Sequence, residues 1–489
     1  MKKLLYILFG FLFICNAYAA QIVNVEYIHN LISQEWDITV PYNPALTNVK
    51  SIANMKYLLT AVDVANEILN GEKTTDYGNG EFATTRIADT TATIQAVETL
   101  VQKEIEYKFF LTTTSTNSFS FSISAAGEFV VDWGDGTVET ITKPDTTNTT
   151  YSHTYSTSKS YTIKLAGQAT AYNTDEYTAA ISFSNTRNFQ YAYNIASIDG
   201  SLGAIFGTLS SDTNNQPRFY QTFYNAYSMR VAIPANLFTG ISGAPASSMF
   251  KSTFEGCTGL TGAIPDGLFA GISGAPASGM FRSTFSGCSG LTGAIPDGLF
   301  AGISGKPAGS MFDSTFYGCS GLTSIPSDLF AGISGAPASY MFYSTFSGCS
   351  GLTGAIPDGL FGNLSGAPKN YMFQGTFSGC SGLTGAIPDG LFGNLTGAPK
   401  SYMFDRTFEG CSGLTSIPEN LFGNISGTAQ NYMFRRTFSN CTSFTGPSAR
   451  INGQYLYEIW LSATSTQVGD MYSGATKLSD YASIPSAWK

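Results

Sequence analysis

Seven cysteines recur at a nearly fixed interval in the second half of this chain of 489 residues. They are Cys257, Cys288, Cys319, Cys349, Cys380, Cys411 and Cys441, at spacings of 31, 31, 30, 31, 31 and 30 residues. Such a period is typical of units that stack on one another. Neighbouring stacked strands lie about 4.8 Å apart, a separation that a disulfide permits. Equivalent side chains point the same way, which favours a ladder of buried thiols. The cysteine spacing alone is compatible with both serial disulfides and free thiols.

Other reactive side chains are few. The histidines are His29 and His153, and the chain has no nucleophile elbow, HExxH helix or glycine-rich phosphate loop. A glycosidase needs only two carboxylates, but nearly every acid in the repeats occupies a turn or a variable position. We therefore expect a protein without catalytic activity and without a cofactor.

Carboxylates in turns raise the question of calcium. Four of them recur in Pro-Asp-Gly turns, at Asp266, Asp297, Asp358 and Asp389. Aspartate is common there because it hydrogen-bonds to the local backbone, so we expect a structural role. Asp132 and Asp135 form a second pair, too small a ligand set to indicate calcium without further oxygen ligands.

Each repeat unit has two predicted elements. Phe250, Phe254 and Cys257 follow one another at i, i+4 and i+7, which predicts a helix that begins near Pro245. The segment 260–264 predicts a short strand whose copies form a parallel sheet.

The positions that vary most between units would lie on the helix face opposite this apolar stripe. Tyrosine and arginine accumulate there, and both residue types are common at the centres of binding interfaces. The candidate recognition surface is Tyr340, Tyr343, Tyr371, Tyr402, Arg406, Tyr432, Arg435 and Arg436. The alternative is a solvated face that varies because nothing constrains it.

The N-terminus has the pattern of a secretory signal: Lys2 and Lys3, an apolar run, then Ala17-Tyr18-Ala19. We expect cleavage after Ala19 and a secreted or cell-surface protein without a transmembrane segment. Two stretches of helical periodicity, 55–69 and 94–108, follow.

A net charge of −9 with 12% charged residues argues against nucleic-acid binding.

Residues 111–195 alternate apolar and polar side chains, as half-buried strands do. They contain Trp133-Gly134-Asp135-Gly136 and, later, His153-Thr154-Tyr155. This order resembles the PKD-type immunoglobulin-like sandwich. The resemblance implies a structural role for the tryptophan, the tight turn and the histidine segment.

The repeated pattern F..C..L...IP..LF resembles the BspA-like class of leucine-rich repeats, at Cys257, Leu260, Ile264-Pro265, Phe269 and their counterparts. That class has shorter units than the 30 or 31 residues here. The resemblance implies adhesion or recognition of other proteins at a cell surface.

These observations predict a multidomain protein. The expected segments are a signal peptide (1–19), a mainly helical region (20–110), a PKD/Ig-like β-sandwich (111–195), a linker (196–217), an α/β leucine-rich-repeat-type solenoid with a short parallel sheet (218–450) and a C-terminal cap (451–489). The expected function is adhesion or protein recognition. The alternatives are carbohydrate binding by the tyrosines and a purely structural surface layer. The ligand, the mode of attachment and the oligomeric state stay open.

Overall fold

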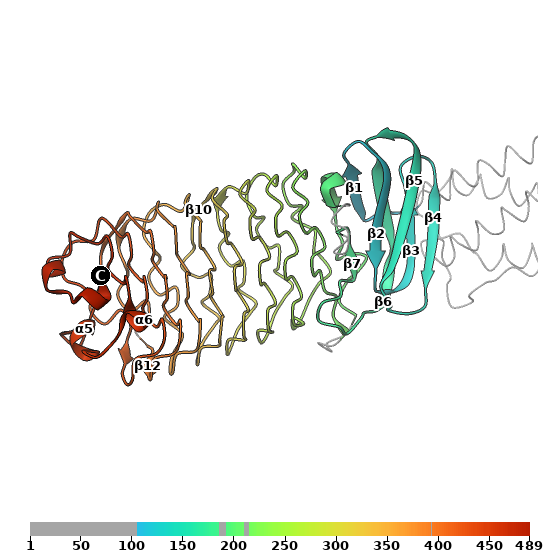
Figure 1. Cartoon of the computed structure of the whole chain (residues 1–489). Helices are drawn as coiled ribbons and strands as arrows, with labels where there is room; N and C mark the ends of the chain where they lie inside the picture. The colour runs from blue at the N-terminus through green and yellow to red at the C-terminus, as the bar shows by residue number, and fades with distance from the viewer. Residues whose placement is uncertain (1–104, 185–191, 210–214, 393) are drawn as a thin grey trace, which may run out of the picture.

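The computed structural model describes residues 105–184, 192–209, 215–392 and 394–489. The expected signal peptide and nearly all of the expected helical region lie outside these residues. Within them, no helix is both long and apolar enough to cross a membrane. Figure 1 shows a β-sheet unit at one end, followed by a stack of repeat units that ends at the C-terminus.

The first part of the described chain is built from two antiparallel sheets. One sheet has the order β4 (Val138–Lys143), β3 (Ala126–Asp132), β6 (Thr162–Ala171), β1 (Phe109–Thr113) and β8 (Ile195–Gly200). The other has the order β5 (Thr149–Lys159), β2 (Thr116–Ile123) and β7 (Ile181–Ser182). A short 3-10 helix, η1 (Ala192–Asn194), leads into β8, so the sheet takes residues from the segment expected to be a linker. The rings of Phe121 and Trp133 pack 5.5 Å apart in the core.

The Trp-Gly-Asp-Gly turn is held by the segment that contains His153. The Tyr155 hydroxyl donates a hydrogen bond to the Trp133 carbonyl (2.9 Å), and the His153 ring stacks on Trp133 at 5.2 Å. His153 Nε2 lies 2.8 Å from Asp135 Oδ2, and Lys164 Nζ donates to Asp132 Oδ2 at 2.8 Å. Both aspartates therefore have partners within the fold.

This turn makes part of the stability depend on pH. Desolvation alone would raise the pKa of Asp135, but hydrogen bonds from His153 and Thr137 lower it to about 2. A carboxylate with a lowered pKa stabilises the fold above its unfolded pKa of about 4, and this contribution is lost as the pH falls towards 2. We expect Asp135→Asn to reduce the melting temperature at pH 6 and to flatten its decline between pH 4 and 2.5. Parallel melting curves of the two proteins at every pH would contradict this.

The fold class expected for the repeats is wrong. Among the described residues the α-helices are α5 (Leu456–Ile459) and α6 (Ser465–Val468), of four residues each, and both follow the repeats. The repeats therefore form no α/β leucine-rich-repeat-type solenoid, and most regular structure belongs to the antiparallel sheets.

A short continuous parallel sheet is also absent from the described repeats. Parallel pairing is limited to isolated bridges and to the pairs β9 (Gly293–Ala294) with β10 (Leu322–Ser324), β11 (Gly385–Ala386) with β13 (Leu414–Ser416), and β12 (Thr396–Gly397) with β14 (Asn424–Ile425). The glycines and prolines of these segments interrupt longer strands.

A series of turns replaces the predicted helix. The N–H groups of Thr253 and Cys257 bond to carbonyls three residues earlier, those of Phe250 and Phe254, at 3.2 and 3.0 Å. The N–H of Phe254 instead bonds to the Thr284 carbonyl of the next unit at 2.9 Å. Alternate N–H groups thus close local turns and join successive units.

The backbone conformation explains why no helix forms. Ser248, Ser252 and Gly256, at every fourth residue, have φ values of 55°, 56° and 76°. Left-handed residues at this interval are incompatible with a right-handed helix. The apolar interval of four residues, which suggested helical periodicity, is the interval of these turns.

Phenylalanine rings fill the core of the stack in three columns. Phe281 and Phe312, in neighbouring units, stack with centroids 5.9 Å apart and an angle of 3° between planes. Phe300 packs against Phe312 at 4.8 Å from another column. Burying one such side chain contributes about 1.5–3 kcal/mol. The columns make the stack continuous.

The seven repeat cysteines are free and buried beside these columns. Each thiol donates to a phenylalanine carbonyl of the preceding unit, as Cys349 Sγ does to Phe316 O at 2.9 Å. Burial raises the pKa of Cys349 to about 12. We expect these thiols to react with Ellman's reagent only after unfolding in guanidinium. Rapid reaction of the folded protein, or a lack of reactive thiols after unfolding, would contradict the ladder.

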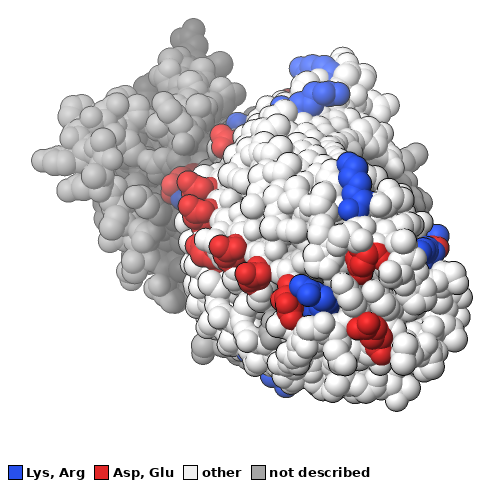
Figure 2. Space-filling model, turned by 90° about the vertical axis from the view of Figure 1, so that its left-hand side faces the viewer, with Lys and Arg blue, Asp and Glu red and all other residues white. Residues whose placement is uncertain are grey.

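Both ends of the stack are covered. At the N-terminal end, Phe183 N donates to the Thr222 carbonyl (2.9 Å), and its ring stacks on Phe223 at 5.4 Å. At the C-terminal end, Trp460 packs against Phe434 and Tyr472 stacks on Phe438. The antiparallel pair β15 (Arg450–Ile451) and β16 (Gln454–Tyr455), with the 3-10 helices η3 (Tyr481–Ser483) and η4 (Ser486–Trp488), completes this end. Figure 2, viewed from this end, shows that charged side chains are sparse.

Candidate recognition surface

Four tyrosines of the candidate surface form one continuous stack. The ring centroids of Tyr340 and Tyr371 are 4.4 Å apart, with 8° between planes. Those of Tyr371 and Tyr402 are 4.5 Å apart with 12°, and those of Tyr402 and Tyr432 are 4.6 Å apart with 38°. Since the rings cover one another, the stack presents mainly ring edges and hydroxyl groups to solvent. We call these four residues the tyrosine column.

The tyrosine column stands on strained backbone. Tyr340, Tyr371, Tyr402 and Tyr432 have φ values of 59°, 62°, 59° and 56°. The left-handed conformation costs an ordinary residue roughly 1–2 kcal/mol, and glycine adopts it readily. Gly279 occupies the equivalent position in an earlier unit. Desolvation, followed by the effect of neighbouring tyrosines, raises the pKa of Tyr371 and of Tyr402, so both stay neutral hydroxyl donors.

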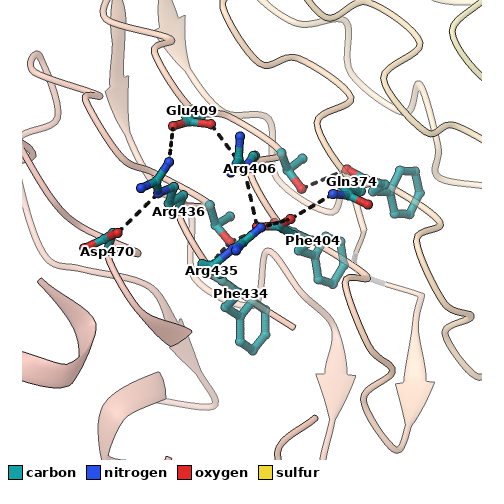
Figure 3. A network of polar contacts seen from close by, with 12 residues as sticks. Gln374, Phe404, Arg406, Glu409, Phe434, Arg435, Arg436 and Asp470 are labelled. Carbon is teal, nitrogen blue, oxygen red and sulfur yellow. Dashed lines mark hydrogen bonds and ion pairs between the residues drawn. The ribbon is translucent and has the colours of Figure 1, made fainter. Parts of the chain in front are cut away.

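A buried aspartate, Asp405, organises the polar groups beside the column. Figure 3 shows this network, with Gln374, Arg406 and Arg435 among the labelled residues. Arg435 donates from Nε to Asp405 Oδ1 and from Nη2 to Asp405 Oδ2, both at 3.0 Å. Gln374 Nε2 donates to Asp405 Oδ2 at 2.8 Å. The hydrogen bonds that Arg435 donates to Asp405 raise the pKa of Arg435. The Arg435 guanidinium also lies 4.2 Å from the centre of the Tyr432 ring, a cation–π distance. These contacts join the arginine to the column.

Arg406 and Arg436 extend this network towards solvent. Each side chain is 40% exposed, and both lie 3.8 Å from Glu409. Arg436 Nε donates to Asp470 Oδ2 at 3.2 Å, so the network reaches the C-terminal cap. Arg406 Nε is buried and makes no hydrogen bond. The exposed guanidinium groups can bind further carboxylates, because their present ion pairs have long N–O distances or are exposed to solvent and are therefore weak.

The expected surface residues therefore lie together, but on a series of turns instead of a helix face. Tyr343 adjoins the first ring of the column, 5.9 Å from Tyr340 at 50°. Asp405 was not among the expected site residues, because a charged residue at a variable position was expected to face solvent. Its side chain is fully buried. The sequence signal for its ion pair was Arg435, an opposite charge at the equivalent position of the next unit.

Asp266, Asp297, Asp358 and Asp389 are exposed in their turns. Within the described ranges, no group of three or more His, Cys, Asp or Glu side chains has a metal-binding arrangement.

No family model, curated protein or solved structure matches this chain.

Proposed function

We propose that this protein is an exported, non-catalytic recognition protein that binds another protein through the tyrosine column and its neighbouring arginines. The observation that carries the proposal is the column itself. Tyrosines occupy the equivalent position in four successive units, where the backbone favours glycine, and each of them is at least partly exposed. Residues held on strained backbone cluster at functional sites.

The chemistry of the surface indicates the kind of partner. Tyrosine edges offer hydroxyl donors and apolar carbon at little conformational-entropy cost, and Arg406 and Arg436 add exposed positive charge. A protein surface with carboxylates around an apolar centre is complementary to this arrangement. Stacking of sugars along the column is disfavoured because each internal ring face already contacts another tyrosine.

Export is proposed from the N-terminal pattern of 1–19. Kinship with BspA-like surface proteins is proposed from the recurring cysteine, leucine, Ile-Pro and phenylalanine positions, without their coil geometry. Kinship of the β-sheet unit with PKD domains is proposed from the Trp133 turn and the segment of His153 that holds it. All three agree with a role at a cell surface.

The proposal is tested with the double substitution Tyr371→Ser and Tyr402→Ser. Serine occupies the same position in Ser248 and Ser310, with the same left-handed backbone, so the fold is retained. On an array of purified extracellular proteins, we expect the double variant to lose at least tenfold in affinity for the proteins that the full chain binds.

Tyr317→Ser is the matched control, because Tyr317 is 48% exposed and lies outside the column. Its binding should equal that of the unchanged protein. Equal binding of the double variant to every captured protein would reject the surface. Binding to a glycan array alone would assign the protein to carbohydrate recognition instead.

A further inference from the structure

The tyrosine column ends abruptly at Tyr340. Tyr371 covers one face of the Tyr340 ring, and the equivalent residues in the two preceding units are Ser310 and Gly279. No ring of the described residues stacks in parallel on the other face; Tyr343 contacts Tyr340 at a tilt of 50°. Tyr340 is 37% exposed. The column thus ends in a partly exposed ring on which no second described ring stacks from the side of Ser310.

The backbone in front of this face carries almost no side chain. A Cβ atom added to Gly279 would meet only Ser248 Oγ, at 3.4 Å. Beyond it the surface is occupied again, because Ser248 Oγ donates to Glu176 at 2.8 Å and Lys251 lies 4.3 Å from the Tyr177 ring centre. The open stretch therefore spans two units between these contacts and Tyr340.

An ion pair belongs to the same two units. Arg282 Nε lies 3.1 Å from Asp313 Oδ2, and each residue is three positions after the small residue of its unit, Gly279 or Ser310. The Arg282 side chain is 45% exposed, whereas that of Asp313 is 6% exposed. Ser314 Oγ donates to Asp313 Oδ1 at 2.8 Å, which fixes the carboxylate. Arg282 and Asp313 thus hold, in the two units before that of Tyr340, the position that Tyr343 holds in its own unit.

We propose that this place binds one hexopyranose ring, with its C–H face on Tyr340 and its hydroxyls on Arg282 and Asp313. The face of an aromatic ring is its negative side, which attracts the weakly positive C–H groups of a sugar. Sugar hydroxyls both donate and accept, which matches a paired guanidinium and carboxylate. An apolar peptide side chain would use the ring but leave the charged pair unmatched. Galactose fits the Tyr340 ring best, because its axial 4-hydroxyl lies on one face of the sugar and leaves several C–H groups exposed together on the other.

This site shares Tyr340 with the protein-binding surface of the proposed function, but it uses the ring face of Tyr340, whereas the proposed function uses the ring edges of the column. A single sugar ring on one open aromatic face should bind with a Kd on the order of 1 mM, or about −4 kcal/mol. The protein-binding test substitutes Tyr371 and Tyr402, whereas the sugar test substitutes Tyr340 and Arg282. The two proposals can therefore fail independently.

The experiment is saturation-transfer NMR of the full chain with methyl β-galactopyranoside as the probe. We expect transfer to be strongest at the C–H protons of one ring face. Tyr340→Phe should retain the signal, because it keeps the ring face. Tyr340→Ser, which copies Ser310, should reduce it at least fivefold, and Arg282→Ala should weaken it. Tyr432→Ser, at the other end of the column, is the matched control and should leave it unchanged.

Three results would overturn the site: no transfer to the galactoside, unchanged transfer in Tyr340→Ser, or loss in Tyr432→Ser equal to that in Tyr340→Ser. Perturbation of the Tyr340 ring signals by a proline-rich peptide and not by the sugar would also overturn it, in favour of a peptide ligand.

Discussion

Phe312→Ala should lower the free energy of unfolding by about 3–5 kcal/mol, because the stack cannot collapse around the lost ring. Phe312 contacts four other phenylalanines, at centroid distances of 5.9, 4.8, 4.7 and 5.6 Å. Each unit is held mainly by its two neighbours, so the defect should also weaken the coupling between the two halves of the stack. In guanidinium titrations followed by circular dichroism, we expect an earlier transition that divides into two steps.

Tyr317→Ala is the control for this substitution. It removes a large aromatic ring from the same unit, but Tyr317 is 48% exposed and should change stability by no more than about 0.5 kcal/mol. A single transition for Phe312→Ala at the midpoint of the unchanged protein would show that the phenylalanine columns do not couple the units.

Removal of residues 451–489 should convert the protein into an aggregating form. Trp460 and Tyr472 would no longer cover Phe434 and Phe438, whose rings they contact at 5.6 and 5.8 Å. The N–H of Phe438 would also lose the Met471 carbonyl, at 2.9 Å, like other donors of the last unit. An uncovered end with apolar rings and unpaired N–H groups is a template for a second stack.

Light scattering after size-exclusion chromatography measures this effect. We expect a mass distribution well above that of the full chain, increasing with protein concentration. Leu461→Ser is the matched control, since Leu461 is 84% exposed within the same cap. If the shortened chain and the full chain have the same number of subunits, the cap does not protect the end.

The sequence was informative about stacking and misleading about the conformation of a unit. The period of the cysteines predicted units in register, and the thiols of Cys349 and its counterparts do bond from unit to unit. The intervals of Phe250, Phe254 and Cys257 suit a helix and a chain of four-residue turns equally. Ser252 and Gly256, small residues four apart, were the local sign of left-handed turns.

The surface shows a similar division. The repeat predicts that tyrosines at one repeated position lie in a row. It does not predict that their rings stack, because stacking depends on side-chain torsions that periodicity does not specify. Their stacking decides which chemistry the line can perform, since it leaves the internal faces covered and Tyr340 open. The burial of Asp405 depends on packing between units and could not be read from one repeat.

The hydrogen bonds between successive units determine how the molecule responds to mechanical load. A force that pulls the two ends of the stack apart acts along bonds such as that from Phe254 N to Thr284 O, and it opens them one unit at a time. Each released unit of 31 residues lengthens the chain by roughly 100 Å. The stack would then extend in a series of nearly equal steps, and each step would dissipate mechanical work.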